Sequence, residues 1–127
     1  MKCLLDTHTT LWFFDHVEKL SKKVYDIILD LKNDKYVSIA SVWELAIKIS
    51  IGKLTFDGGV DNFIYTIEDN GFELFPLVGD HVSQVAKLPF IHRDPFDRIL
   101  VSTAMCEEMS LVTSDTNIQK YDVSWTW

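Results

Sequence analysis

Short strand-like runs alternate with helix-like segments along this chain, and no other feature restricts the fold as strongly. Apolar residues cluster briefly at residues 2–6, 36–40, 72–75, 111–113 and 123–125. Between these runs, apolar residues recur every three or four positions, which is typical of amphipathic helices. Alternating strands and helices favour a parallel sheet with helices on both faces. We therefore expect an α/β three-layer sandwich whose central, mostly parallel sheet has about four to five strands.

The helix boundaries follow from capping residues and stop signals. Ser21 is expected to cap a helix that runs to Leu31, and Asp94 to cap another that opens with Pro95. Ser41 is expected to begin a third helix, which stops at Gly52. The full set of expected helices covers residues 9–16, 21–31, 41–50, 60–69, 79–88 and 94–109.

Length and composition indicate one domain. The chain has 127 residues, of which 47% are hydrophobic, so we expect a single domain spanning residues 1–127. Asp6 interrupts the first apolar run, unlike in a signal peptide, and no window holds the ~18 apolar residues of a membrane span. We therefore expect a cytoplasmic protein without a membrane segment. Cys3 and Cys106 have neither the number nor the spacing of a disulfide framework or a zinc ribbon.

The net charge of −7 argues against nucleic acid as a partner, because phosphate binding usually requires a basic surface. This objection loses its force if some of the acids surround a bound cation. The positions of the acids therefore decide between the two cases.

Four acids fall where strands end or helices begin. Asp6 directly follows the first strand, and Asp115 lies two residues beyond the fourth. Glu44 and Asp97 are expected in the first turns of their helices. Ligands bind at the carboxyl ends of parallel strands, where the helices that follow also start. We expect these four carboxylates to converge on one rim of the sheet.

Simpler structural interpretations exist for most of these acids. Asp6 fits a solvated acid in a loop, and Asp115 fits the cap of a short helix. Glu44 stands three residues after Ser41, as in a capping box, and four residues before Lys48, as in an ordinary ion pair.

Asp97 is the hardest of the four to explain structurally. It precedes Leu100, Val101 and Ala104 by three, four and seven residues, so it belongs to the face that these residues bury. An acid on an apolar face is costly unless its charge is compensated. The N-terminus of the helix supplies only about 0.3–1 kcal/mol, and a cation would supply far more.

A cluster of carboxylates suits a hard divalent cation. Mg²⁺ and Mn²⁺ take oxygen ligands, often carboxylates together with water and substrate phosphate. Such a metal can activate water and stabilise the charge of a phosphodiester. An acidic pocket would then recruit metal, and the metal would recruit phosphate.

In order along the chain, five segments resemble the PIN domain family, specifically the bacterial ribonuclease toxins of VapC-type toxin–antitoxin pairs. They are LLDTHTTLW, SIASVWELAIKISIGKL, HRDPFDRILVSTA, LVTSD and a short final strand with Trp125. The resemblance covers nearly the whole chain and implies a PIN-like fold and a Mg²⁺- or Mn²⁺-dependent endoribonuclease. It also implies a homodimer, held by a small antitoxin whose tail crosses the active groove.

The resemblance assigns roles to particular residues. Asp6, Glu44 and Asp97 fall on the acidic triad of the family, and Asp115 falls on its fourth, more variable acid. The hydroxyl residues that the family carries beside these acids correspond here to Thr7, Thr113 and Ser114. The implied chemistry is hydrolysis of RNA by metal-activated water, leaving a 5′-phosphate and a 3′-hydroxyl.

Several cationic residues near the acids have two interpretations each. Arg93 and Arg98 would contact RNA phosphates or an antitoxin carboxylate, although Arg98 would equally form an ion pair with Asp94. Lys48 would lean toward the acids or pair with Glu44. His92 would touch substrate or play a structural role.

Other functions remain compatible with the sequence. A receiver-like signalling domain also gathers acids and Mg²⁺ at strand ends, but it requires paired acids after the first strand, where this chain has one. A catalytically inactive PIN-fold interaction module predicts the loss of one or more acids, whereas all four are present. A PIN nuclease that acts on DNA or structured RNA is a further alternative.

Overall fold

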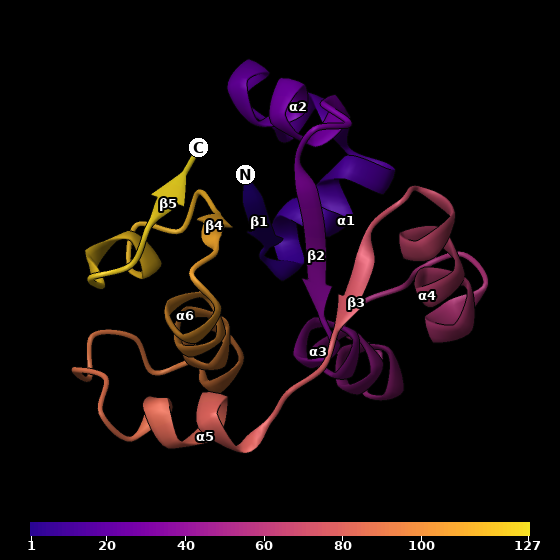
Figure 1. The fold of residues 1–127 in the computed structure, drawn as a ribbon. Helices are drawn as coiled ribbons and strands as arrows, with labels where there is room; N and C mark the ends of the chain where they lie inside the picture. Colours follow the sequence, from indigo (N-terminus) through magenta and orange to yellow (C-terminus); the bar gives the residue numbers. More distant parts are fainter.

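The computed structural model describes all 127 residues, and its elements alternate as the sequence predicts (Figure 1). The strands are β1 (Lys2–Leu5), β2 (Asp34–Ser38), β3 (Glu73–Phe75), β4 (Ser110–Val112) and β5 (Trp125–Thr126). The helices are α1 (Thr7–Asp15), α2 (Lys22–Leu29), α3 (Ile39–Ser50), α4 (Gly59–Asp69), α5 (Gly79–Val85) and α6 (Pro95–Glu107). Two short 3₁₀ helices, η1 (Val17–Lys19) and η2 (Ile118–Lys120), follow α1 and β4.

The five strands form one sheet in the order β3-β2-β1-β4-β5, and every neighbouring pair is parallel. Leu5 at the end of β1 pairs with Val37 on one side and with Val112 on the other. The predicted α/β class is confirmed, with a sheet that is entirely parallel. This strand order differs from the 2-1-3-4-5 order of receiver-like domains, so the receiver-like alternative is excluded.

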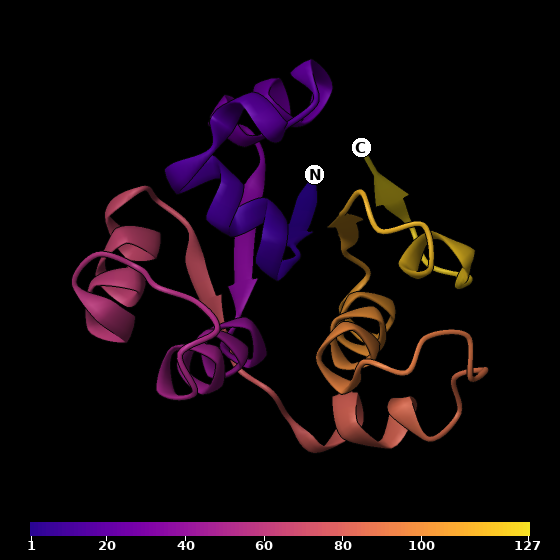
Figure 2. The ribbon, with the colours of Figure 1, turned by 180° about the vertical axis from the view of Figure 1, so that it is seen from behind.

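Alternate residues of the central strand face two separate hydrophobic cores. Cys3 and Leu5 belong to a cluster that includes residues of α2, α3 and α4. Leu4, between them, belongs to a second cluster with residues of α6 and η2. Figures 1 and 2 show α4 beside α3, and α5 beside α6. Helices therefore cover both faces of the sheet, and the carboxyl ends of its strands meet at one edge.

The start of α3 corrects one prediction. The helix begins at Ile39, directly after β2, and Ser38 is its N-cap, with Oγ accepting a hydrogen bond from the backbone N–H of Ala40. Ser41 lies inside the helix, so the predicted cap and the capping box with Glu44 are wrong. The strand ends two residues earlier than predicted because Ser38 captures the first free N–H of the helix.

The end of α2 corrects another prediction. Ser21 caps the helix as expected, but the helix ends at Leu29, and Leu31 is 93% exposed. Asp30 has an extended backbone, and the side chain of Asn33 donates a hydrogen bond to the carbonyl of Ile27. This side-chain bond satisfies a carbonyl of the last turn and ends the helix before Leu31 can pack.

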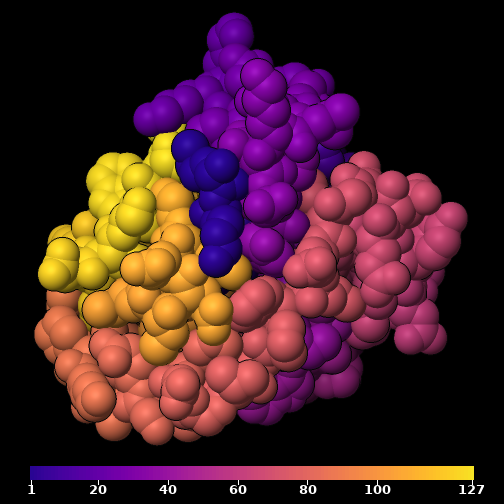
Figure 3. All heavy atoms as spheres, in the orientation of Figure 1, coloured from indigo at the N-terminus to yellow at the C-terminus, as the bar shows by residue number.

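The remaining boundaries differ by a few residues. α1 begins at Thr7, earlier than predicted, because Asp6 caps it. α5 ends earlier than predicted, at Val85, whereas α6 keeps its predicted Asp94 cap and Pro95 start. No helix in the structure combines the length and the apolar character that crossing a bilayer requires. In the space-filling view, the first residues of β1 are exposed between the segments of β2 and of α6 and β4 (Figure 3).

The difference between the two apolar residues near the end of α2 is testable. Ile28→Ala should lower the free energy of unfolding by ~2–4 kcal/mol, because Ile28 is 2% exposed and its removal leaves a cavity. Leu31→Ala should change it by no more than about 0.5 kcal/mol. Urea unfolding followed by circular dichroism measures both. A large loss in Leu31→Ala would mean that α2 continues as the sequence predicts.

Candidate metal centre

Asp6 lies at the carboxyl end of the central strand and is only 5% exposed. Its Oδ1 accepts a hydrogen bond from the backbone N–H of Thr9 at 2.8 Å, which caps α1. Burial raises the pKa of Asp6 above its ordinary value, and hydrogen bonds from Thr113 and Thr9 oppose this shift. The interpretation of Asp6 as a solvated loop acid is therefore wrong.

Glu44 is also buried, with 4% of its surface exposed. Its Oε1 lies 2.7 Å from the hydroxyl of Thr7, and its Oε2 lies 2.8 Å from the ammonium of Lys48. The Thr7 hydroxyl also lies 2.8 Å from that of Ser41. The predicted ion pair with Lys48 is formed, and it neutralises a carboxylate that helix α3 holds in the interior.

Asp97 stands in the first turn of α6, above the buried Leu100 and Val101, as predicted. Its side chain is 19% exposed, and its Oδ2 lies 3.1 Å from Nε2 of His92. Burial, followed by the negative charges of Asp94, Glu44 and Asp115, raises the pKa of Asp97 to about 7, while His92 opposes the shift. Without a cation, this carboxyl group holds its proton close to neutral pH.

The two carboxylate oxygens of Asp115 have different partners. Its Oδ1 accepts hydrogen bonds from the backbone N–H groups of Asn117 at 2.8 Å and Ile118 at 3.4 Å, so the predicted capping role is confirmed. Its Oδ2 lies 3.3 Å from Nε2 of His92. The capping role therefore does not remove Asp115 from the rim, because the second oxygen faces Asp97 through His92.

Hydrogen bonds and charge together link the four acids around the carboxyl edge of the sheet. Thr113 connects Asp115 to Asp6: its Oγ1 accepts the backbone N–H of Asp115 at 3.0 Å, and its side chain also hydrogen-bonds to Asp6. Thr7 follows Asp6 in the chain and binds Glu44. The link from Glu44 to Asp97 is electrostatic and not a contact: the charge of Glu44 helps to raise the pKa of Asp97, which completes a ring of four acids. The four acids therefore lie along the carboxyl edge of the sheet, and their common role in one site stays a prediction.

Within this ring, one group is much tighter than the rest. The potential ligand atoms of His92, Asp97 and Asp115 all lie within 4.8 Å of one another. Asp6 and Glu44 are not part of that group. Oδ1 of Asp6 is bound by the start of α1, and the two oxygens of Glu44 are bound by Thr7 and Lys48.

The arginines and Ser114 differ in their surroundings. Arg93 is exposed beside the acids and forms no ion pair, and Ser114 is half-buried without a side-chain hydrogen bond. Arg98 is only 8% exposed and donates to the carbonyls of Pro89 and Val85, so it neither pairs with Asp94 nor presents its guanidinium to a phosphate. Both predicted roles of Arg98 are replaced by a structural one.

His92 is the contributor that sequence reasoning undervalued. Its Nδ1 accepts the backbone N–H of Asp94, and its Nε2 lies between Asp97 and Asp115. The only signal in the sequence is its place two residues before the N-cap of α6, from which an imidazole can reach the N-terminus of that helix.

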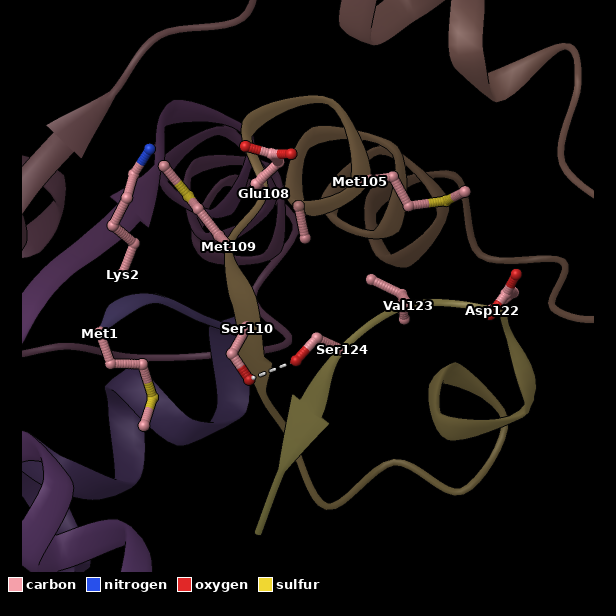
Figure 4. Close-up of a pocket in the computed structure, with 10 residues that line it drawn as sticks. Met1, Lys2, Met105, Glu108, Met109, Ser110, Asp122, Val123 and Ser124 are labelled. Atoms are coloured by element: carbon pink, nitrogen blue, oxygen red, sulfur yellow. Dashed lines mark hydrogen bonds between the residues drawn. The ribbon is translucent and has the colours of Figure 1, made fainter.

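The largest cavity of the molecule lies elsewhere. It has a volume of about 560 Å³ and is lined by residues such as Met1, Lys2, Ser110 and Ser124, at the amino ends of β1 and β4 (Figure 4). None of the four acids borders it. The candidate site is thus defined by converging charge at the opposite edge of the sheet.

The donor set fits a hard divalent cation. Carboxylate oxygens are the ligands that Mg²⁺ and Mn²⁺ prefer, and Asp97 and Asp115 are both accessible from solvent. Burial, and then the charges of neighbouring acids, raise the pKa of Asp97, and a bound cation would oppose both effects.

Comparison with known proteins gives a consistent result. The model of the PIN domain matches residues 3–124. Among solved structures, VapBC2 from Rickettsia felis, bound to a promoter DNA fragment, is 14% identical with a TM-score of 0.75, over 99% of this chain and 98% of that chain. VapBC-1 from nontypeable Haemophilus influenzae is 14% identical with a TM-score of 0.71, over 99% and 97%. FitAcB from Neisseria gonorrhoeae is 19% identical with a TM-score of 0.63, over 98% and 96%.

These identities establish a shared fold and nothing further. No curated protein matches the chain significantly.

The raised pKa of Asp97 predicts an unusual dependence of stability on pH. Because the folded state keeps a proton that the unfolded state releases near 3.8, the metal-free protein should lose stability as the pH rises from that value to about 7. Asp97→Asn cannot ionise, so near pH 8 with EDTA it should be more stable than the wild type by roughly 1–3 kcal/mol. This difference should shrink toward pH 4, as measured by denaturant unfolding at each pH.

Asp61→Asn is the matched control, because Asp61 also lies in the first turn of a helix but is exposed. It should show no comparable gain. An Asp97→Asn variant that is less stable than the wild type at both pH values would contradict the idea of repulsion at this site.

Proposed function

The chain belongs to the PIN domain family, and we propose that it is a Mg²⁺- or Mn²⁺-dependent endoribonuclease, the toxin of a toxin–antitoxin pair. The observation that carries the proposal is the ring of four acids at the carboxyl edge of the sheet, with Asp97 held near its protonation midpoint at neutral pH. A cation bound at such a site would neutralise the charge of the clustered carboxylates. RNA supplies the phosphates that a metal at this position would bind.

Asp6, Glu44, Asp97 and Asp115 are the residues that would hold the metal, which when bound would lower the pKa of water and stabilise charge on the phosphodiester. Substrate would approach from the side of Asp97 and Asp115, because these side chains are 19% and 34% exposed whereas Asp6 and Glu44 are buried. Hydrolysis would break the bond between phosphorus and the 3′ oxygen, leaving a 5′-phosphate and a 3′-hydroxyl.

The other residues of the rim prepare the acids for this role. Thr7 orients Glu44 from one side, and Lys48 balances its charge from the other. Thr113 joins Asp6 to Asp115, and Ser114 follows it at the edge of the site. Arg93 is exposed and unpaired, which suits a contact with phosphate. These local cations, together with metal, answer the objection that a net charge of −7 raises.

A homodimer is supported by an apolar stripe on the exposed side of α3. Ile39, Trp43, Ile47 and Ile51 recur every four residues and are 40%, 60%, 37% and 58% exposed. Next to Trp43, an apolar groove of about 310 Å³ runs to Phe96 on α6. A second copy of the chain, related by a two-fold axis, would bury this surface against its equivalent.

An antitoxin is the second proposed partner. One similar structure, 14% identical to this chain, is described as a toxin–antitoxin complex from Klebsiella pneumoniae. For this chain, a small protein whose tail carries a basic residue into the acidic rim would compete with metal and substrate. The proposed place of action is the cytoplasm, where RNA and antitoxin are both present.

Cleavage of a mixed RNA pool tests the enzymatic proposal. The purified chain should cut RNA with Mg²⁺ or Mn²⁺ but not with EDTA, and Asp97→Asn and Glu44→Gln should each reduce the rate by roughly 10²–10³-fold. Asp122→Asn, which changes an exposed acid beside the opposite cavity, should cut like the wild type. Gel electrophoresis with mapping of the ends gives the rate and the product chemistry.

Cutting that persists in both site variants would place the activity elsewhere or in a contaminant. A folded, antitoxin-free chain that binds metal but cuts neither RNA nor single-stranded DNA would favour the catalytically inactive interaction module.

The dimer prediction is tested separately. Trp43→Glu should convert the chain from dimer to monomer, because it places a charge in the middle of the apolar stripe. Tyr65→Glu is the control: Tyr65 is a similarly exposed aromatic residue on α4, at 64% against 60% for Trp43, and its variant should remain dimeric. Light scattering after size-exclusion chromatography measures the mass. A wild-type chain that is monomeric at all concentrations would disprove the proposal.

A further inference from the structure

We propose that His92 is a positioning residue of this site, a neutral hydrogen-bond donor that clamps the carboxylates of Asp97 and Asp115 without binding metal itself. The inference rests on the proposed function for its metal, but its geometric basis is independent of catalysis. The proposal also gives a role to Arg98, which is buried and has no carboxylate partner.

The hydrogen-bond partners of the His92 imidazole determine which of its two nitrogens carries the proton. Nδ1 of His92 accepts a hydrogen bond from the backbone N–H of Asp94 at 3.1 Å, so Nδ1 must be unprotonated. The proton of the neutral ring then lies on Nε2. That nitrogen is 3.1 Å from Oδ2 of Asp97 and 3.3 Å from Oδ2 of Asp115, and both oxygens are acceptors.

This tautomer argues against His92 as a metal ligand. A histidine that binds metal through Nε2 presents the lone pair of that nitrogen and donates its Nδ1–H to an acceptor. Here Nδ1 faces a donor, the N–H of Asp94, whose own position is fixed because Asp94 caps α6. Binding metal at Nε2 would bring two N–H groups face to face.

A buried scaffold holds the backbone that carries His92. The N–H of His92 donates to the phenolic oxygen of Tyr121 at 2.8 Å, and Arg98 donates to the same oxygen at 3.1 Å. Arg98 also donates to the carbonyls of Pro89 at 3.0 Å and Val85 at 3.2 Å. Burying a guanidinium is costly, and here two of its hydrogen bonds go to the segment that leads to His92 and a third goes to Tyr121.

The clamp has a direct consequence for the two acids. A single Nε2–H between the two Oδ2 atoms offsets their repulsion and keeps both carboxylates within reach of one cation. Oδ1 of Asp97 accepts no hydrogen bond, so it stays available to a metal while Oδ2 is held. His92 would therefore orient the ligand from outside the coordination sphere, an effect typically worth 10–100-fold in metal affinity.

Mn²⁺ binding to the purified wild-type chain and three variants, without RNA, tests the clamp. His92→Phe keeps the ring shape but loses the donor, and it should weaken the Mn²⁺ affinity 10–100-fold in calorimetric titration. His92→Gln keeps an N–H₂ group near the position of Nε2 and should restore most of the affinity. His16→Gln, which alters an exposed histidine that contacts Glu18 and none of the four acids, should bind like the wild type.

Two spectroscopic readouts separate a clamp from a ligand and from a merely structural residue. In the metal-free protein, ¹⁵N NMR of the imidazole should show His92 protonated on Nε2 and not on Nδ1. In the Mn²⁺-loaded wild type, pulsed EPR should show no directly coordinated histidine nitrogen. A coordinated nitrogen, a proton on Nδ1, or tighter Mn²⁺ binding by His92→Phe would each overturn the proposal.

Failure of the proposed function would appear differently. If the wild-type chain binds no Mn²⁺, its metal dependence is wrong, and the NMR spectrum of the metal-free protein alone then decides whether the Nε2–H clamp exists.

Discussion

Carboxylates that crowd together in a partly buried place repel one another, and the carboxyl edge of this sheet is organised around that repulsion. The effect is seen at Asp97, where burial and the charges of three neighbouring acids raise the pKa to about 7. Each other acid has a local partner: the start of α1 for Asp6, Thr7 and Lys48 for Glu44, and the start of η2 for Asp115. The charge that remains is what a divalent cation would neutralise.

The parallel sheet is what brings these groups to one place. β1 lies in the middle with β2 on one side and β4 on the other, so the residues after all three strands emerge at the same edge. The two hydrophobic cores hold α3 and α6 against opposite faces, and these helices carry Glu44 and Asp97. The same packing buries polar groups at the rim. Hydrogen bonds of Thr7 and Thr113 satisfy some of these groups.

The surface of the molecule has an acidic region at the rim of the sheet and a separate apolar region on α3. The acidic rim would bind metal and, through it, phosphate, whereas the α3 stripe around Trp43 would bind a second copy of the chain. Glu44 and Trp43 are adjacent in sequence and point to these two surfaces. The two surfaces therefore share one helix, α3, of 12 residues.

Local signals in the sequence determined much of this protein: the alternation of strands and helices, the four acids at the ends of strands and starts of helices, and the Ser21 and Asp94 caps. These features depend on residues close together in the chain, where periodicity and capping chemistry act. Only the tertiary structure decided that Arg98 turns inward and that His92 bridges two acids. Tyr121, which anchors both, is 23 and 29 residues away from them, and no local pattern specifies such a contact. Whether a polar side chain faces solvent, a ligand or a buried partner is fixed by what packs around it, and that is known only once the chain has folded.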